Sequence, residues 1–259
     1  MCLIAFAWKV HPLWRLVLIG NRDEFHARPT ATLARWPGSP IIAGRDLQAG
    51  GTWLGATAAG RCAAVTNVRD LHAPVDGISR GLVVSNYLSG SRSASDHAQT
   101  LLATAASYRP FNLLLFDAQG ACFLGNHPQP HVSALEPGVH ALSNADLDTP
   151  WPKTCAIKQG LQAWADRGDD DLLPLLATLA DEQVAPDERL PDTGVGLERE
   201  RWLSSAFVRG EHYGTRASTL VALGHDGSGV MIERGFGPSG CAGRETRLDF
   251  GAFSMSLGR

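Results

Sequence analysis

The sequence predicts an α+β fold in which two β-sheets stack face to face and helices lie on the outside. The predicted elements run in the order strands, helices, strands, helices, strands, which is not the regular alternation of a doubly wound sheet. The first two apolar segments, residues 2–10 and 14–19, are almost continuously apolar. Such runs are typical of strands that are covered on both faces. A sheet placed between a second sheet and a helical layer satisfies both observations.

The other elements follow from apolar runs, glycine-rich joints and helical spacing. Strands are predicted at residues 2–10, 14–19, 41–44, 52–57, 61–67, 111–116, 121–124, 139–143, 215–223, 229–234 and 245–250. Helices are predicted at residues 79–88, 95–106, 154–167, 171–181 and 198–208. Ser95 is the expected N-cap of the second helix. No shift in composition marks a boundary, so residues 1–259 are predicted to form a single domain.

Composition indicates an ordinary globular protein of the cytoplasm. A net charge of -3 gives no reason to expect nucleic acid or an anionic membrane surface as a partner. The apolar runs are far shorter than the roughly 20 residues of a membrane-spanning helix. The start of the chain lacks a signal-peptide pattern. Five cysteines without a CxxC pair favour a reducing compartment and predict neither a disulfide framework nor a zinc site.

Cys2 has the clearest chemical potential in the chain. If Met1 is removed, Cys2 carries a thiol and a free α-amine, so one residue supplies both nucleophile and base. The two groups have reference pKa values of about 8.5 and 7.7–8, so proton transfer between them near neutral pH costs little. The alternative is a small apolar residue that begins a buried strand. Position alone favours that alternative.

Four polar residues, Asn21-Arg22-Asp23-Glu24, follow the second predicted strand. A hairpin would bring them close to Cys2. Arg22 would then lower the pKa of the thiol and bind a carboxylate or phosphate, while Asp23 would hold the α-amine. An ordinary polar turn explains the same four residues equally well.

Four further residues are predicted to take part in the site. Asn67 and Asn144 each follow an apolar strand, where a side-chain amide can donate to a developing oxyanion or simply form a turn. Arg216 begins a late strand and is either a substrate clamp or an edge charge. Trp53 is expected in the wall of the core or of a pocket.

No metal site is predicted, and no cofactor is required. His127 and His131 are four residues apart, but Pro128 and Pro130 prevent the helix that would place both on one face. The sequence contains no HExxH, GxSxG or Walker motif.

Taken together, these segments resemble the NRDE family, which is the family of the transport and Golgi organisation protein of animals. The resemblance covers most of the chain in order. It rests on Met1-Cys2, residues 21–24, 28–30, 43–46, 50–55, 66–67, 110–113, 142–144, 148–153 and 215–216.

The NRDE family is in turn similar to the N-terminal nucleophile (Ntn) hydrolases, especially the cysteine branch of penicillin V acylases and bile salt hydrolases. That similarity implies a four-layer αββα sandwich. The implied catalytic residues are Cys2, Arg22, Asp23, Asn144 and Arg216. The residues expected to bind substrate are Asn21, Glu24, Asn67 and Trp53. Those hydrolases separate the arginine and the aspartate by two residues, whereas here they are adjacent, so Glu24 is an alternative to Asp23.

Two functions of different class follow from the resemblance. The first is an amidase or thioesterase that acts on a small acyl substrate through Cys2. The second is a carrier without turnover, whose ligand is haem, acyl-CoA or another lipid. In the carrier, Arg22 and Arg216 would hold propionates or phosphates, and Cys2, His11 or His26 would meet the haem iron. The sequence does not indicate an oligomeric state.

Overall fold

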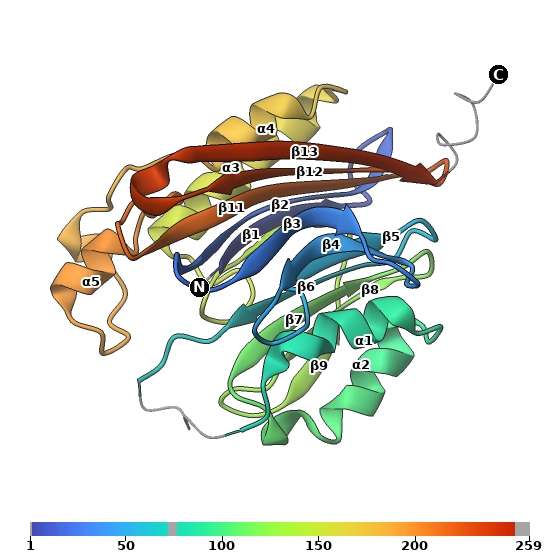
Figure 1. Cartoon of the computed structure of the whole chain (residues 1–259), viewed down its shortest axis with the longest axis horizontal. Coiled ribbons are helices and arrows are strands. Elements are labelled where there is room, and N and C mark those ends of the chain that lie inside the picture. Colours follow the sequence, from blue (N-terminus) through green and yellow to red (C-terminus); the bar gives the residue numbers. More distant parts are fainter. Residues whose placement is uncertain (1, 72–76, 252–259) are drawn as a thin grey trace.

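Two antiparallel β-sheets form the centre of the protein in a computed structural model, which describes residues 2–71 and 77–251 (Figure 1). The first sheet has the strand order β10-β1-β2-β11-β12-β13, and the second has the order β3-β4-β5-β6-β7-β8-β9. The strands of the first sheet are β1 (Cys2–Trp8), β2 (Trp14–Phe25), β10 (Gly138–Leu142), β11 (Tyr213–Gly224), β12 (Ser228–Phe236) and β13 (Ala242–Gly251). Those of the second are β3 (Thr30–Arg35), β4 (Ile41–Asp46), β5 (Leu54–Thr57), β6 (Cys62–Asn67), β7 (Phe111–Phe116), β8 (Ala121–Gly125) and β9 (His131–Ala134).

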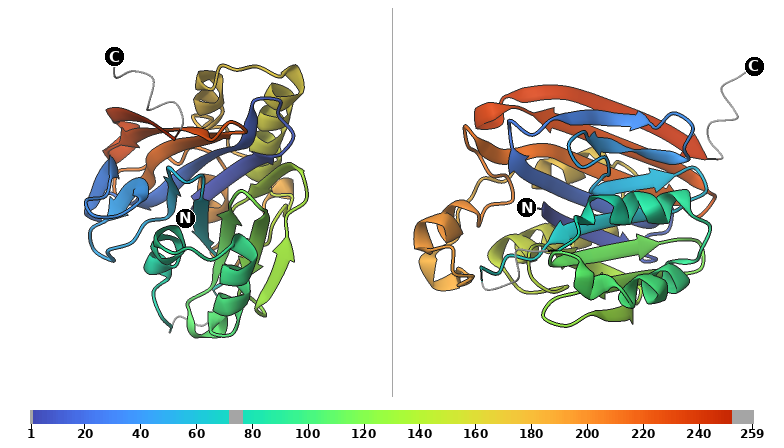
Figure 2. Two further views of the ribbon diagram at one scale, coloured as in Figure 1. Left: turned by 90° about the vertical axis from the view of Figure 1, so that its right-hand side faces the viewer. Right: turned by 60° about the horizontal axis from the view of Figure 1, so that its bottom comes forward.

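Helices cover the outer face of each sheet, which gives four layers (Figure 2). Helix α3 (Pro152–Arg167) and helix α4 (Leu173–Thr178) pack on the first sheet. Helix α1 (Val83–Ser89) and helix α2 (Ala94–Leu102) pack on the second. Helix α5 (Leu197–Trp202) and four short 3-10 turns, η1 (Arg80–Leu82), η2 (Ala105–Ser107), η3 (Asp187–Arg189) and η4 (Pro238–Gly240), lie in the connections. The predicted α+β class and αββα layering are confirmed.

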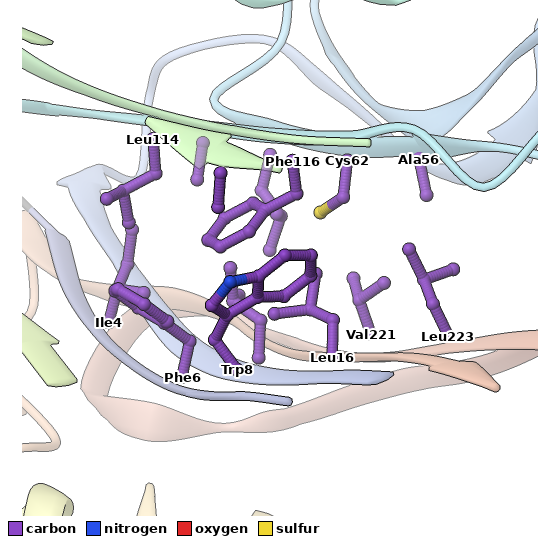
Figure 3. Close-up of a cluster of buried hydrophobic side chains, with 14 of the residues drawn as sticks. Ile4, Phe6, Trp8, Leu16, Ala56, Cys62, Leu114, Phe116, Val221 and Leu223 are labelled. Atoms are coloured by element: carbon purple, nitrogen blue, oxygen red, sulfur yellow. The ribbon is translucent and has the colours of Figure 1, made fainter. Parts of the chain in front are cut away.

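The layer between the sheets is apolar over much of its length (Figure 3). Phe6 and Trp8 project into it from β1, and Phe116 projects into it from β7. The Phe6 and Phe116 rings meet edge to face with centroids 5.2 Å apart, a favoured aromatic geometry. Alternate residues of β1 face the other way and pack under α3. Because both faces are covered, the strand reads as a continuous apolar run.

Most predicted elements are present, with informative differences. Strand β2 continues to Phe25, so the polar segment at 21–24 lies inside a strand and the turn interpretation is wrong. Strands β3 and β9 were not predicted; they are short, lie at the two edges of the second sheet and bury few residues. Helix α2 is capped by Ser93, whose hydroxyl accepts from the N–H of Asp96, rather than by Ser95. Across residues 2–71 and 77–251, no helix is long and apolar enough to cross a membrane.

Candidate functional site

A cavity of about 480 Å³ opens between the two sheets, where β1 begins and β2 ends. Seven of the nine predicted site residues line it, namely Cys2, Arg22, Asp23, Glu24, Trp53, Asn67 and Arg216. Seven arginines and four acidic residues contribute to its walls. The wall of the cavity is therefore rich in charged side chains, in contrast to the apolar layer beside it.

Strand pairing places Cys2 directly opposite Arg22. Cys2 lies on the same face of β1 as Ile4, and Arg22 lies on the same face of β2 as Leu18. Because Ile4 and Leu18 belong to the layer between the sheets, Cys2 and Arg22 also face that layer. The expected hairpin geometry is thus present. Burial raises the pKa of the Cys2 thiol, while Arg22 and Arg80 act in the opposite direction. Formation of the thiolate depends on these cations and on what enters the cavity.

Asp23 borders the cavity, but strand alternation directs its side chain to the opposite face of β2, toward the helical layer. Its carboxylate Oδ1 accepts a hydrogen bond of 2.7 Å from the Thr215 hydroxyl. Burial raises the pKa of Asp23, and the positive charge of Lys153 lowers it. Lys153 is itself buried in α3, donates to the Leu203 carbonyl at 2.8 Å, and has its pKa lowered by burial to about 8. Asp23 is therefore a buried carboxylate supported from behind the cavity.

Glu24 lies on the cavity side and belongs to a charge network with two arginines. Its carboxylate is 3.7 Å from Arg22 and 3.7 Å from Arg28. Asp46, on β4 of the other sheet, pairs with Arg28 at 2.8 Å and lies 3.9 Å from Arg22. Since Glu24 and Asp23 face opposite ways, Glu24 is placed to balance these arginines, and it is not an equivalent of Asp23.

Arg216 enters the cavity through a break in strand register. Thr215 pairs with Asp23 and Ala217 pairs with Arg22, so Arg216 is an extra residue in β11, as in a β-bulge. Its guanidinium donates to the carbonyls of Phe25 at 2.9 Å and Arg28 at 3.1 Å. These bonds fix the side chain at the mouth of the cavity.

The two predicted asparagines have different positions. Asn67 lines the cavity, whereas Asn144 is fully buried behind it. The Asn144 amide donates to the Asn67 carbonyl at 3.0 Å and to its side-chain oxygen at 3.1 Å. Its NH₂ group is thus already used, and the expectation that Asn144 donates directly to an oxyanion is corrected: Asn144 positions Asn67.

Asn21 also requires a correction, because it does not line the cavity. It points from β2 toward the helical layer, where its amide donates to the carbonyls of Leu179 and Ala206 at 2.8 Å each. The Ser218 hydroxyl donates to its oxygen at 2.6 Å. Asn21 is a structural crosslink, and its predicted role in substrate binding is wrong.

Trp53 forms part of the cavity wall, as predicted, and Gly20 makes room for it. A Cβ at position 20 would lie 3.2 Å from the indole and 2.7 Å from the Leu3 carbonyl. His11 and His26 do not line the cavity. The His11 ring stacks on Trp164, and His26 Nε2 lies 3.2 Å from the Gly210 carbonyl.

Sequence reasoning missed several residues around Cys2, among them Arg80, Arg109, Lys153 and Glu233. Lys153 is part of the 148–153 segment and has no further signal in the sequence. Arg80 lies inside the predicted helix 79–88 and Arg109 just before the predicted strand 111–116, and neither pattern indicates a side chain that faces a cavity. Burial raises the pKa of Glu233, which accepts from the Leu33 N–H at 2.7 Å. Within residues 2–71 and 77–251, no group of three or more His, Cys, Asp or Glu side chains is arranged to hold a metal ion.

Comparison with known sequences relates the chain to one family. The family profile described as "Transport and Golgi organisation 2" matches residues 1–238. The human transport and Golgi organization protein 2 homolog is 32% identical over 270 residues, covering 95% of this chain and 97% of that protein. The corresponding Drosophila melanogaster protein is 28% identical over 261 residues, covering 90% and 91%.

Comparison with solved structures supports the fold. The C2A mutant of the conjugated bile acid hydrolase from Clostridium perfringens superposes with a TM-score of 0.55 at 8% identity, covering 96% of this chain and 92% of that one. At this identity the likeness establishes the fold and not the reaction. The predicted Ntn-hydrolase-like sandwich is thereby confirmed.

Proposed function

We propose that this chain, which belongs to the Transport and Golgi organisation 2 family, hydrolyses amides or thioesters of small acyl groups, with Cys2 as the nucleophile once Met1 is removed. The observation that carries the proposal is the position of Cys2 at the head of β1, on the cavity wall and opposite Arg22. A protein with the same fold is named a conjugated bile acid hydrolase, and this likeness supports the proposal at the level of the fold alone.

In the proposed reaction, the Cys2 thiolate attacks the acyl carbon and the α-amine of Cys2 accepts the thiol proton. The leaving amine or thiol takes that proton as the carbon–nitrogen or carbon–sulfur bond breaks. Water then attacks the acyl-enzyme, releases the carboxylic acid and restores the thiol. Asp23 holds the α-amine, and Lys153 favours the ionised form of that carboxylate. Asn67, oriented by Asn144, is the proposed donor to the oxyanion.

The proposal is tested by two proteins that differ only in the position of the α-amine. One begins at Cys2, and the other carries a single glycine before Cys2; both are released from a cleavable tag and verified by intact mass. They are assayed on a panel of acyl amides and thioesters. We expect activity from the first protein only, and none from its Cys2→Ala variant. Equal activity with an amine one residue away would exclude the α-amine as the base.

A second candidate function is a carrier for an anionic ligand such as acyl-CoA or haem, which the seven arginines around the cavity favour. Of the iron ligands considered for haem, only Cys2 lines the cavity, because His11 and His26 do not. Haem titration separates the two functions. A Soret shift that Cys2→Ala abolishes supports the carrier, and an unshifted spectrum argues against haem.

The reducing conditions of the cytoplasm suit either function. All five cysteines are free, and oxidation of Cys2 would remove the thiol that the hydrolase needs. We therefore retain the cytoplasm as the proposed compartment.

A further inference from the structure

We propose that Arg80 and Arg109 form an anion-binding subsite of the cavity. The subsite would select substrates that carry a carboxylate, phosphate or sulfonate a few bonds from the carbonyl attacked by Cys2. This inference rests on the proposed function, because it assigns a substrate class to the same cavity.

Backbone contacts hold the two arginines next to each other. Arg80 begins η1, two residues after Ile78, and Arg109 precedes β7. The N–H of Ile78 donates to the Ser107 carbonyl at 2.8 Å, and the N–H of Arg109 donates to the Ile78 carbonyl at 3.2 Å. The segments that carry the two side chains are therefore tied together by two hydrogen bonds.

A close backbone approach fixes the same segment against the opposite wall. A Cβ at Gly51 would lie 1.5 Å from the carbonyl oxygen of Gly81. No residue other than glycine fits there without a shift of the backbone. The segment that contains Arg80 therefore packs directly against the turn that follows β4. The side chains of Arg80 and Arg109 both line the cavity.

Within residues 2–71 and 77–251, Arg80 and Arg109 share with Arg244 the property that their side chains have no ion pair or hydrogen bond, but Arg244 is exposed on the edge strand β13. Arg28 pairs with Asp46 at 2.8 Å, and Arg216 donates to two backbone carbonyls. Arg45 lies over the Trp36 ring at 4.4 Å. In the part of the chain that the structure describes, no ion pair or hydrogen bond involves the side chain of Arg80 or Arg109. Two adjacent guanidinium groups without counter-ions attract a planar oxyanion, which each can bind in a bidentate manner.

Electrostatics connect this pair to the nucleophile. Burial lowers the pKa of Arg80, the charge of Cys2 raises it and the charge of Arg109 lowers it. Arg80 reciprocally lowers the pKa of the Cys2 thiol. An anion bound between the arginines would relieve their repulsion and would lie close to Cys2. Arg22 is less suited to this role, because Glu24 and Asp46 already balance its charge.

Two alkylating reagents of similar size measure the subsite without knowledge of the natural substrate. In both reactions the Cys2 thiolate displaces iodide and forms a carbon–sulfur bond, but iodoacetate is an anion and iodoacetamide is neutral. Their rate ratio at Cys2 is measured by mass spectrometry of the Cys2 peptide. We expect Arg80→Gln to lower the iodoacetate-to-iodoacetamide ratio about fivefold, in line with the effect of local charge on association rates. Arg109→Gln should lower it less, because Arg109 is more exposed.

Arg167→Gln is the matched control. Arg167 lies at the end of α3, is exposed and pairs with Asp169 at 2.7 Å, so its removal should leave the ratio unchanged. An unchanged ratio in both Arg80→Gln and Arg109→Gln would overturn the subsite while leaving Cys2 as a nucleophile. Failure of Cys2 to react even with iodoacetamide would instead count against the proposed function.

Anion binding supplies a readout that does not depend on Cys2 reactivity. Acetate, inorganic phosphate and methanesulfonate are compared by thermal shift, which distinguishes the three anion classes. We expect at least one to stabilise the wild-type protein and the Arg167→Gln control, and to have lost that effect in the Arg80→Gln/Arg109→Gln double variant. No shift in the wild-type protein, or an equal shift in the double variant, would refute the subsite.

Discussion

The layer between the two sheets has an apolar end and a charged end, and the same two strands build both. Toward its apolar end, β1 contributes Phe6 and Trp8, which pack against Phe116. Toward its charged end, β1 contributes Cys2, and β2 contributes Arg22 and Glu24. Along one face of a strand, side chains a few residues apart thus lie either in the core or in the cavity wall, although the pairing of β1 with β2 is continuous.

The contrast between the two ends explains how the protein tolerates charges between its sheets. Buried charges are costly unless they are paired, and their pairing adds little net stability. Burial of large apolar side chains is the dominant favourable contribution to folding. We infer that the apolar end holds β1 and β2 in register, and that the charged end is free to serve binding and chemistry.

Removal of an aromatic ring from the apolar end should have the largest effect on stability. Phe116 is fully buried between the sheets, so Phe116→Ala is expected to lower the free energy of unfolding by about 3–5 kcal/mol through lost burial and a residual cavity. Urea denaturation measures the loss. Leu173→Ala, at a half-exposed position on α4, is the control and should change stability by less than about 0.5 kcal/mol. A loss below about 1 kcal/mol for Phe116→Ala would show that the apolar end does not dominate stability.

Removal of the Asn21 crosslink should have a smaller effect on stability and leave the cavity intact. Asn21→Ala strips partners from two buried carbonyls and the Ser218 hydroxyl, so we expect a loss of about 2–3 kcal/mol in the free energy of unfolding. The iodoacetamide rate of Cys2 should stay within about twofold, because Asn21 faces the helical layer and the barrier to the reaction is unaltered. A tenfold fall in that rate, with the protein still folded, would instead place Asn21 in the site.

The strands inside the sheets were predictable because apolar residues dominate them. Strands β1 and β7 begin where the apolar runs predicted them. Strands β3 and β9 were missed because an edge strand makes fewer buried contacts and needs no apolar run: β3 fully buries only Leu33. The polar end of β2 was misjudged for a different reason. Its alternate residues face a cavity rather than a core, so the apolar pattern does not continue there.

Most residues of the candidate site were predictable as neighbours of one cavity, but the contacts that each one makes were not. Hairpin pairing brings Cys2 and Arg22 together as expected. By contrast, Asn67 and Asn144 have the same sequence context, each following an apolar strand, and only the folded structure shows that Asn67 lines the cavity while Asn144 is buried. Arg216 depends on a bulge, and Arg80 on a backbone contact between distant segments. These features arise from tertiary packing, which local sequence patterns do not encode.

The smallest expected effect concerns a charge at the margin of the apolar end, at Asp148. Its carboxylate lies 2.7 Å from His140 Nδ1 and 2.8 Å from Lys158 Nζ, and His140 stacks on Phe6. Burial alone would raise the pKa of Asp148. The hydrogen bonds that its carboxylate accepts from His140, Lys158 and the Ala141 N–H outweigh burial and lower this pKa to about 2. Because the pKa is depressed in the folded state, the stabilisation is complete above the unfolded value of about 3.9 and is lost as the pH falls toward 2.

Asp148→Asn isolates this contribution, because asparagine also tolerates the left-handed backbone at this position, where φ is 57°. We expect the variant to be about 1 kcal/mol less stable than the wild type at pH 7, since the pair is partly exposed to solvent. That difference should disappear when urea denaturation is repeated near pH 2. If the difference in unfolding free energy between the wild type and Asp148→Asn were the same at pH 7 and pH 2, the packing of the side chain and not its charge would stabilise this region. The apolar end would then be independent of ionisation, and the contrast with the charged end would be sharper than proposed.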